Sequence, residues 1–455
     1  MPIFEWRSVM PASADELFAY HARPGAFRRL APPWQKMRVL EETGDVTSGR
    51  VAFDVWFGPV KRHWVAEMGS AMPGRQFVDR QVDGPFASWE HVHRFVPIDD
   101  ERSELLDHIE FSLPAGGLTD SVGEGPAGKT LSRLFRFRHE RTRLDLGRHA
   151  VWADRPRLTV AIAGASGLIG SHLADYLMTG GHRVVRLVRN REAGPDEIAW
   201  DPSTGALHHG ALEGVDAIVN LAAVSLSGVW TAGRKKAIIE SRVQTTRTLA
   251  EAIARMDSPP SVFISASGIG AYGSRGGEAI TEQTPRGEGF LADVCRVWEE
   301  AALPARDAGV RLVIPRQGIV MSAAGGALPV MLPAFKAGLG ARLGDGNQYW
   351  SWVALDDLLA AIEWTLHDDE LEGVVNFTSA EPVTNREFTK TLGRVLRRPA
   401  ALAAPSFFLR HGLGGMGDEM LLASQRAMPA RLRSQGFRFA FPTLEDALRY
   451  ELGRS

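Results

Sequence analysis

The sequence predicts an α/β protein with a doubly wound parallel sheet, preceded by a smaller α+β domain. Residues 158–163 form a short apolar run, which passes through a glycine-rich turn at 164–170 into a helix-like stretch at 171–178. Strand and helix patterns then alternate as far as residue 316, which is typical of a parallel sheet covered by helices. Residues 1–150 come before this alternation and therefore need a domain of their own.

Composition narrows the class of protein. The chain has 455 residues, a net charge of −2 and a single cysteine, Cys295. The charge provides no overall field for nucleic acid or an anionic membrane, and one cysteine excludes an internal disulfide. No apolar stretch approaches the roughly 20 residues of a membrane span, and residues 1–7 lack the layout of a signal peptide. We therefore expect a cytoplasmic protein with neither nucleic acid nor membrane as its partner. The oligomeric state is not readable.

Residues 1–150 combine extended runs with a closing helix. A strand at 3–10 precedes a helix at 14–20, for which Ser13 is the expected cap, and a short helix near 25–30. A glycine-rich loop at 114–128 leads into an amphipathic helix at 130–147. Between them lie six extended runs, at 37–42, 50–57, 60–68, 76–82, 88–96 and 104–113.

This order of elements resembles the helix-grip fold of the START-like (SRPBCC) superfamily. In that fold a curved antiparallel sheet wraps the last helix and leaves an apolar cavity. Residues 77–95 are similar to a segment of the subgroup that is fused to epimerase-like domains. The resemblance implies that residues 1–150 form a ligand-binding domain, with a hydrophobic small molecule as its ligand.

Two histidines in this region lie two residues apart. His91 and His93 point to one face of a strand, so they are either half of a metal site or a hydrogen-bonded pair in or at the rim of the ligand cavity. No third ligand is evident nearby in the sequence. We therefore predict the hydrogen-bonded pair and no metal ion.

The glycine turn has the layout of a dinucleotide-binding turn. Gly164 allows a sharp turn out of the strand, Gly167 leaves room for a pyrophosphate, and Gly170 lets the helix pack closely on the strand. Free N–H groups at the helix start then face a phosphate. The sequence therefore predicts cofactor contacts from this turn, namely from Gly164, Ser166, Gly167, Leu168, Ile169 and Gly170.

The end of the second strand, at 181–189, indicates which dinucleotide binds. An acidic residue there would hold the ribose 2′-hydroxyl of NAD, whereas an arginine suits the 2′-phosphate of NADP. This strand ends in Arg189, with Arg191 just beyond it and no acid at its end. We predict NADP(H).

Further strands at 217–223, 262–267 and 311–316 alternate with helices at 232–255 and 291–307. Cofactor contacts are expected at the carboxyl ends of the strands. Arg242, on the first of these helices, either reaches the phosphates or forms a surface ion pair. The strand ends add Leu221, Ala222, Ser265, Pro315 and Val320 as candidate cofactor contacts.

Several runs, in order, resemble the extended short-chain dehydrogenase/reductase (SDR) superfamily, and more closely its atypical "epimerase family" branch. They are 164–170, 198–202, 219–223, 265–273, 290–299, 340–357, 382–385, 421–426 and 436–441. The resemblance implies a Rossmann domain at 157–400 and a family-specific C-terminal segment of the substrate lobe at 401–455. It also implies redox or isomerase chemistry on a small molecule.

The proton-transfer pair of that superfamily, Tyr-x-x-x-Lys, is absent, because none of the five tyrosines has a lysine four residues on. Leu291 and Cys295 stand near the positions of the pair, and we interpret Cys295 as a buried apolar residue. Ser267 and Tyr272 are the remaining catalytic candidates. Two tryptophans, Trp350 and Trp352, alternate on an expected strand and either line the substrate cleft or cover a core.

Two hypotheses stay open at this point. The first is an NADP(H)-dependent oxidoreductase or epimerase of atypical mechanism, which acts on a small carbonyl or a sugar-nucleotide-like substrate. The second is a non-catalytic NADP(H)-binding sensor or module, coupled to a START-like domain that binds a hydrophobic ligand. The intact cofactor turn favours the first, and the missing tyrosine and lysine favour the second.

Overall fold

The computed structural model describes residues 2–113, 126–189 and 191–454. Most of the glycine-rich loop expected at 114–128 lies outside the described residues. The chain divides into two compact units. The first comprises Met1–Pro156, Asp175–Gly181 and Tyr450–Ser455, and the second comprises Arg157–Ala174 and His182–Arg449. In the described part of the chain, no helix combines the length and apolar character needed to cross a bilayer.

The first unit follows the predicted order of elements. Ser13 caps the first helix, since its hydroxyl accepts a hydrogen bond from the amide of Glu16 at 3.2 Å. The elements are β1 (Ile3–Met10), α1 (Ala14–Ala22), α2 (Ala26–Arg29), β2 (Met37–Thr43), β3 (Arg50–Phe57), β4 (Val60–Met72), β5 (Gln76–Asp83), β6 (Ser88–Pro97), β7 (Ser103–Ser112) and α3 (Pro126–Ala150).

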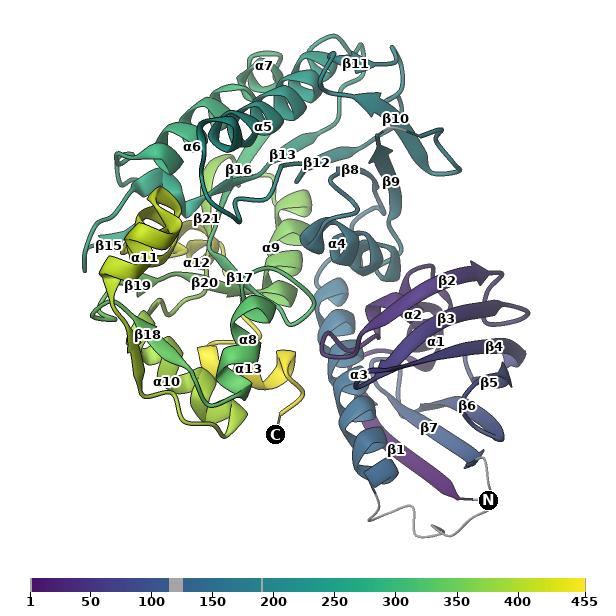
Figure 1. Cartoon of the computed structure of the whole chain (residues 1–455). Coiled ribbons are helices and arrows are strands. Elements are labelled where there is room, and N and C mark those ends of the chain that lie inside the picture. Colours follow the sequence, from purple (N-terminus) through teal and green to yellow (C-terminus); the bar gives the residue numbers. More distant parts are fainter. Residues whose placement is uncertain (1, 114–125, 190, 455) are drawn as a thin grey trace. The chain divides into compact units, whose positions relative to one another are not determined.

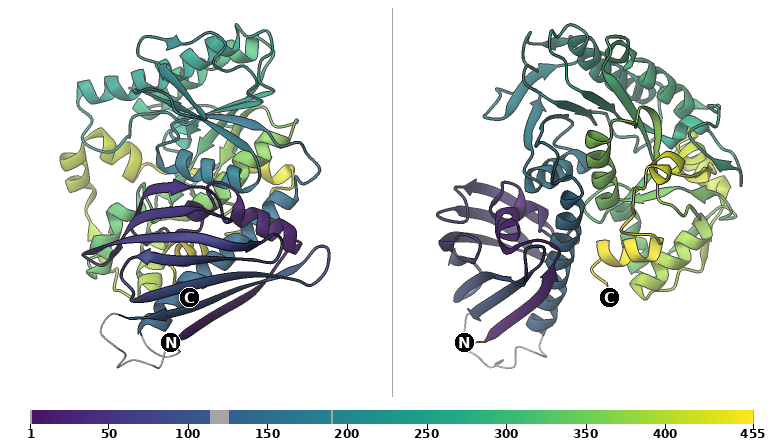
Figure 2. Two further views of the ribbon diagram at one scale, coloured as in Figure 1. Left: turned by 90° about the vertical axis from the view of Figure 1, so that its right-hand side faces the viewer. Right: turned by 180° about the vertical axis from the view of Figure 1, so that it is seen from behind.

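An antiparallel sheet with the order β1-β7-β6-β5-β4-β3-β2 packs against α3 (Figures 1 and 2). Alternate residues of β6, from Trp89 to Phe95, are buried because strand side chains alternate between the two faces. Phe135 of α3 packs against Phe4, Trp89 and Phe111 of the sheet. This is the expected helix-grip arrangement, which brings the inward residues of β5, β6 and β7 under α3.

The main sheet of the second unit has the order β11-β10-β9-β8-β12-β13-β16-β14, with β21 also paired to β16. Its pairs are parallel except for β10 with β11. The strands are β8 (Thr159–Ala163), β9 (Arg183–Val188), β10 (Glu197–Asp201), β11 (Ala206–Leu207), β12 (Ala217–Asn220), β13 (Val262–Ser265), β14 (Ser267–Gly268), β16 (Arg311–Gln317) and β21 (Gly373–Phe377).

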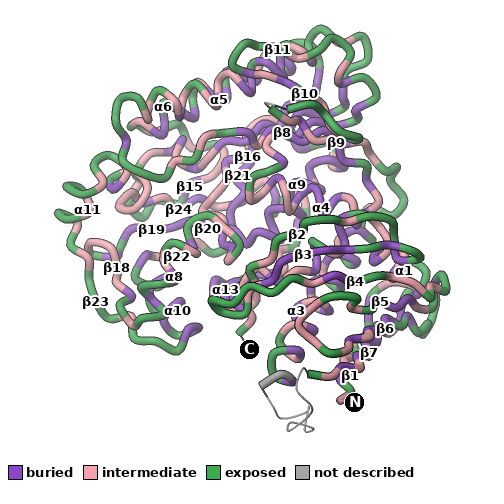
Figure 3. The backbone as a smooth tube through the Cα atoms, turned by 45° about the vertical axis from the view of Figure 1, so that its right-hand side comes forward, coloured by how far each residue is buried: buried purple, intermediate pink, exposed green. Residues whose placement is uncertain are grey.

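Helices cover both faces of this sheet (Figure 1). On one face lie α5 (Ala232–Ile253), α6 (Phe290–Glu300) and α7 (Leu303–Asp307), and on the other lie α4 (Leu168–Thr179) and α9 (Leu355–His367). The central strands are almost wholly buried, as the purple tube in Figure 3 shows. The strand order reverses between β8 and β12, so a doubly wound sheet is expected to bind its ligand at their carboxyl ends.

One predicted helix is split in two. Residues 291–307 form α6 and α7 rather than a single helix. Pro304 lies in the first turn of α7. Proline lacks an amide N–H, and its ring clashes with the carbonyl four residues earlier, which is that of Glu300, where α6 ends.

The remaining short elements build a second lobe, in which strands from 401–455 pair with earlier ones. Strand β15 pairs with β24, and β18 with β23. The elements are η1 (Ile269–Tyr272), β15 (Ala279–Ile280), β17 (Ile319–Met321), α8 (Leu328–Lys336), β18 (Ala341–Leu343), β19 (Tyr349–Trp350), β20 (Trp352–Ala354), β22 (Val383–Thr384), α10 (Asn385–Leu396), β23 (Leu402–Ala404), α11 (Ser406–Leu413), η2 (Gly417–Leu422), β24 (Arg426–Ala427), α12 (Ala430–Ser434) and α13 (Leu444–Glu451).

Candidate functional site

The turn between β8 and α4 is packed so closely that two of its glycines have no alternative. Gly164 has a φ of +83°, and a Cβ there would lie 2.8 Å from the carbonyl carbon of Leu221. A Cβ on Gly170 would lie 2.3 Å from the oxygen of Gly164. Gly167 is different, because it is exposed and its added Cβ would meet only that same oxygen, at 3.3 Å. The protein's own packing therefore leaves open space beside Gly167.

A cleft of about 400 Å³ opens at this turn. It is bordered by the ends of β8, β9 and β12, where the strand order reverses. Six of the predicted cofactor residues line it, namely Gly164, Ser166, Gly167, Arg189, Leu221 and Ala222. Arg186 and Trp200 also line it and were missed. Arg186 lies on β9 three residues before Arg189, and this odd spacing on a strand gives no sequence signal that both border one cleft.

Three arginines give the β9 side of the cleft a positive charge. Arg191 forms a two-pronged ion pair with Glu197, with distances of 2.7 and 2.5 Å. These hydrogen bonds, with one from the amide of Gly194, lower the pKa of Glu197 to about 2. Arg189 is exposed and makes no hydrogen bond or ion pair with another described residue. Its guanidinium is therefore available to an anion in the cleft.

Arg242 does not form the surface ion pair that was the alternative to a phosphate contact. It is buried, and its Nη1 donates to the carbonyls of Val224 and Ile238 at 3.1 and 3.0 Å. Its guanidinium lies 4.9 Å from the ring centre of Trp298. Burial lowers the pKa of Arg242 to about 10. The side chain thus ties α5 to the segment that follows β12.

The other predicted cofactor residues are not among those that line this cleft. Leu168 and Ile169 are half-buried at the start of α4, and Gly170 is buried beneath the turn. Ser265 and Pro315 are buried at the ends of β13 and β16, and Val320 is half-buried in β17. These positions lie on the elements expected to hold the cofactor, but the structure gives them no contact with the cleft.

Ser267 belongs to a buried charged network. Its hydroxyl donates to Oε1 of Glu299 at 2.7 Å. Arg316 donates two hydrogen bonds to the same carboxylate, from Nε to Oε1 and from Nη2 to Oε2, both at 3.0 Å. Arg286 also donates to Oε2. Ser267, Glu299 and Arg316 are each less than 5% exposed. The serine hydroxyl therefore donates to a carboxylate inside the protein.

Tyr272 is held in the same way. It is 0% exposed, and its hydroxyl donates to Oδ1 of Asn376 at 2.8 Å. The Arg316 guanidinium lies 4.6 Å from its ring centre. Burial raises the pKa of Tyr272. A tyrosine that transfers protons at neutral pH needs a lowered pKa, so neither its position nor its acidity suits that role.

The two positions that match the missing pair are apolar and enclosed. Leu291 and Cys295 are 8% and 5% exposed, on the face of α6 that packs against η1. Burial raises the pKa of the Cys295 thiol, and the nearby Glu299 raises it further. Cys295 is thus the buried residue that the sequence indicates, and it stays a thiol at neutral pH.

Trp350 and Trp352 do not share one strand. They lie on β19 and β20, which pair with different partners. Trp352 is 0% exposed and its indole N–H donates to the carbonyl of Glu381, while Trp350 packs against Phe388 with ring centres 5.1 Å apart. Both tryptophans therefore fill cores of the second lobe and do not line a cleft.

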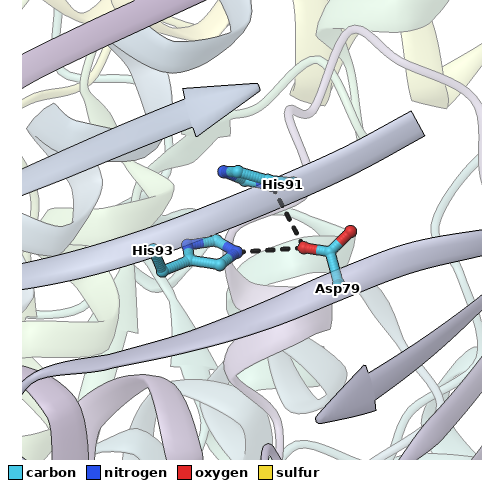
Figure 4. A group of neighbouring side chains, drawn as sticks. All are labelled: Asp79, His91 and His93. Atoms are coloured by element: carbon cyan, nitrogen blue, oxygen red, sulfur yellow. Dashed lines mark hydrogen bonds and ion pairs between the residues drawn. The ribbon is translucent and has the colours of Figure 1, made fainter. Parts of the chain in front are cut away.

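His91 and His93 have close carboxylate neighbours, which the sequence pattern did not reveal (Figure 4). Asp79 lies on the neighbouring strand β5 and Asp107 on β7, and both approach the two imidazoles. Burial alone would lower the pKa of His91, but the two carboxylates raise it to about 9. Both histidines are hydrogen-bonded, as the sequence predicts, and their carboxylate partners come from neighbouring strands.

Comparison with known proteins separates the chain into three matched segments. Residues 160–376 match the NAD dependent epimerase/dehydratase family, and residues 10–135 match the family described as polyketide cyclase / dehydrase and lipid transport. Residues 404–451 match a domain of unknown function, DUF1731. The resemblances inferred for both units are thereby confirmed.

Relatives cover most of the chain. An epimerase family protein of Mycobacterium bovis is 43% identical over 65% of this chain and 98% of its own length. The crystal structure of a nucleoside-diphosphate sugar epimerase from Corynebacterium glutamicum is 32% identical to this chain and has a TM-score of 0.82. The match extends over 99% of this chain and 90% of the epimerase chain.

A second solved structure covers about two thirds of this chain. The human epimerase family protein SDR39U1, crystallised with NADPH, is 31% identical and has a TM-score of 0.60. The match extends over 65% of this chain and 99% of the human chain. A UDP-glucose 4-epimerase from Thermus thermophilus, with 20% identity and a TM-score of 0.51, shares the fold. The chain therefore belongs to the epimerase family of SDR-like proteins, with a helix-grip domain in front of its Rossmann domain.

Proposed function

We propose that the second unit binds NADP(H) in the cleft at the carboxyl ends of β8, β9 and β12. In this proposal the α4 amides and the turn at Gly167 face the pyrophosphate, and Arg189 holds the 2′-phosphate of the adenosine ribose. The observation that carries the proposal is Arg189, an exposed arginine in the cleft that has no partner among the described residues. The human relative crystallised with NADPH supports it.

We further propose an NADP(H)-dependent oxidoreductase or epimerase of atypical mechanism, with a small carbonyl or sugar-nucleotide-like substrate. The nicotinamide supplies or accepts the hydride, as it does across this class of enzymes. In this proposal Ser267 and Tyr272 stabilise the fold around the substrate and do not transfer protons, because their hydroxyls donate hydrogen bonds to Glu299 and Asn376. The proton on the substrate oxygen then comes from water or from the substrate itself.

The test of cofactor choice is the affinity of the full chain for NADPH and NADH. An Arg189→Ala variant should weaken NADPH binding about 10- to 100-fold, because a charge-assisted hydrogen bond contributes about 1.5–3 kcal/mol. NADH affinity should change by less than about threefold, since NADH lacks the phosphate.

Arg183→Ala is the matched control. Arg183 begins the same strand, is exposed, and pairs with Asp196 at 2.7 Å outside the cleft. Its removal should leave both affinities unchanged. Equal losses of NADPH and NADH affinity in Arg189→Ala would refute the NADP(H) assignment.

A second candidate is a non-catalytic NADP(H)-binding module, in which the first unit binds a hydrophobic ligand. The hydrogen bonds of the Ser267 and Tyr272 hydroxyls to buried acceptors favour this candidate, because those hydroxyls are not available to a substrate. NADPH oxidation by any member of a panel of ketones and sugar nucleotides would support the enzyme. Tight NADPH binding with no turnover across that panel would support the module.

A further inference from the structure

Four titratable side chains meet on the buried face of the sheet in the first unit. Strand pairing places Asp79 of β5 opposite His91 of β6, and His93 of β6 opposite Asp107 of β7. His91 and His93 share a face because they are two residues apart on one strand. Figure 4 shows both imidazoles beside the Asp79 carboxylate. We call these four residues the His–Asp cluster.

Distances within the His–Asp cluster are short. Oδ2 of Asp79 lies 3.1 Å from Nδ1 of His91 and 3.1 Å from Nε2 of His93. One ligand atom from each of these three residues lies within 4.8 Å of the others. Zinc–nitrogen bonds of about 2.0–2.1 Å in a tetrahedral site put ligand atoms about 3.3 Å apart, so the Asp79 oxygen has the spacing from each imidazole that one shared ion requires.

We infer that Asp79, His91 and His93 form a binding site for a divalent transition-metal ion, with Zn²⁺ as its simplest occupant. Two imidazoles and one carboxylate are ligands that Zn²⁺ prefers, and three protein ligands leave a fourth position for water or a small molecule. This is the ligand number of a reactive metal site rather than of a purely structural one.

Asp107 has the place of a supporting carboxylate. Its Oδ1 lies 2.8 Å from Nε2 of His91, with which it forms a hydrogen bond, and 2.8 Å from Nδ1 of His93, where the contact is close but not aligned as a hydrogen bond; neither ring nitrogen faces Asp79. Histidine ligands commonly donate their second ring N–H to such a carboxylate, which fixes the ring and raises its basicity. Oδ2 of Asp107 in turn lies 2.5 Å from Nε2 of His139 on α3.

Burial argues against a role in stability alone. His91, His93 and Asp107 are 2%, 6% and 3% exposed. Taking a carboxylate such as that of Asp107 out of water costs several kcal/mol, and apolar replacements of similar volume are often equally stable. The Asp79 side chain keeps 18% of its surface exposed, which gives an ion a route into the site.

The test is metal binding by the full-length chain, stripped with EDTA and then titrated with Zn²⁺ by calorimetry and with Co²⁺ by visible spectroscopy. We expect one ion per chain, and Co²⁺ d–d bands of the intensity that a four- or five-coordinate site gives. Asp79→Asn and His93→Gln should weaken binding by more than about 100-fold, and Asp107→Asn by about 10- to 100-fold.

His108→Gln is the matched control. His108 also lies between two carboxylates, Glu5 at 2.9 Å and Glu110 at 3.2 Å, but away from the His–Asp cluster. Binding should survive in this variant. Absence of a Co²⁺ spectrum in the wild type would overturn the inference even if the cluster variants failed to fold. Equal binding in His93→Gln and the wild type, or loss of binding in His108→Gln, would also overturn it.

Discussion

Two regions of the second unit differ in whether their polar groups are exposed or buried. Around the β8–α4 turn, Gly167 and Ser166 are exposed and Arg189 has no partner among the described residues, so groups that bind anions face solvent. Around η1 and α6, Ser267 and Tyr272 donate to buried acceptors, and the positions of the usual proton-transfer pair hold Leu291 and Cys295. The contrast fits the proposed function, because the β8–α4 region is open to a nucleotide while the polar groups around η1 and α6 bind one another inside the protein.

The largest expected effect comes from breaking the network at Glu299. Glu299→Gln leaves Arg316 buried without its carboxylate, and loss of one partner of a buried ion pair costs about 3–5 kcal/mol. Urea denaturation should show that loss in the free energy of unfolding. The neighbouring Glu300 is exposed and pairs with Arg296 at 3.4 Å, so Glu300→Gln should cost at most about 1 kcal/mol. Similar losses in both variants would show that the network is not structural.

A smaller loss is expected from Tyr272→Phe. The variant removes the donor to Asn376 and leaves a buried amide oxygen without that hydrogen bond, which costs about 1–3 kcal/mol. Tyr349 is half-buried, and its hydroxyl makes no hydrogen bond with a described residue, so Tyr349→Phe is the control. Both variants are compared by urea denaturation. If Tyr272→Phe is as stable as the wild type but oxidises NADPH more slowly, Tyr272 acts in catalysis and not in stability.

The smallest effect on stability is expected at the β8–α4 turn, where Gly167 is exposed. The Gly167→Ala methyl group meets only the Gly164 oxygen, in a close contact of 3.3 Å, so the free energy of unfolding should change by less than about 1 kcal/mol. The same methyl group enters the space proposed for the pyrophosphate, and NADPH affinity should fall about tenfold, or about 1.4 kcal/mol. Fluorescence titration with NADPH measures this.

Gly233→Ala is the control for that change, because an added Cβ at the start of α5 meets nothing within 4 Å. It should leave NADPH affinity unchanged. If Gly167→Ala binds NADPH as tightly as the wild type, the pyrophosphate does not approach this turn.

The parts that local sequence determines were the parts that could be predicted. The β8–α4 turn is set by glycines within seven positions of one another, and Gly170 packs against Gly164, although Gly164 packs against the distant Leu221. The run of strands in the first unit was likewise visible from apolar alternation and turn residues. For Trp350 and Trp352 the sequence left a cleft and a core open, because alternation alone does not show that Ser351 separates two strands.

The site details that sequence did not show depend on distant partners. Ser267 meets Glu299 across 32 residues, and Tyr272 meets Asn376 across 104. The same limit applied to His91, since its pairing with Asp79 requires the register of β5 against β6. A single sequence gives the face of each strand, but register requires the geometry of the turn between them.

The most direct test of the contrast between the two regions is NADPH affinity measured beside the free energy of unfolding in Arg189→Ala and Tyr272→Phe. We expect Arg189→Ala to weaken NADPH binding about 10- to 100-fold at unchanged stability. We expect Tyr272→Phe to lose about 1–3 kcal/mol of stability and to bind NADPH within about twofold of the wild type. Wild-type NADPH affinity in Arg189→Ala, or a loss of NADPH affinity in Tyr272→Phe as large as in Arg189→Ala, would contradict the contrast between the two regions.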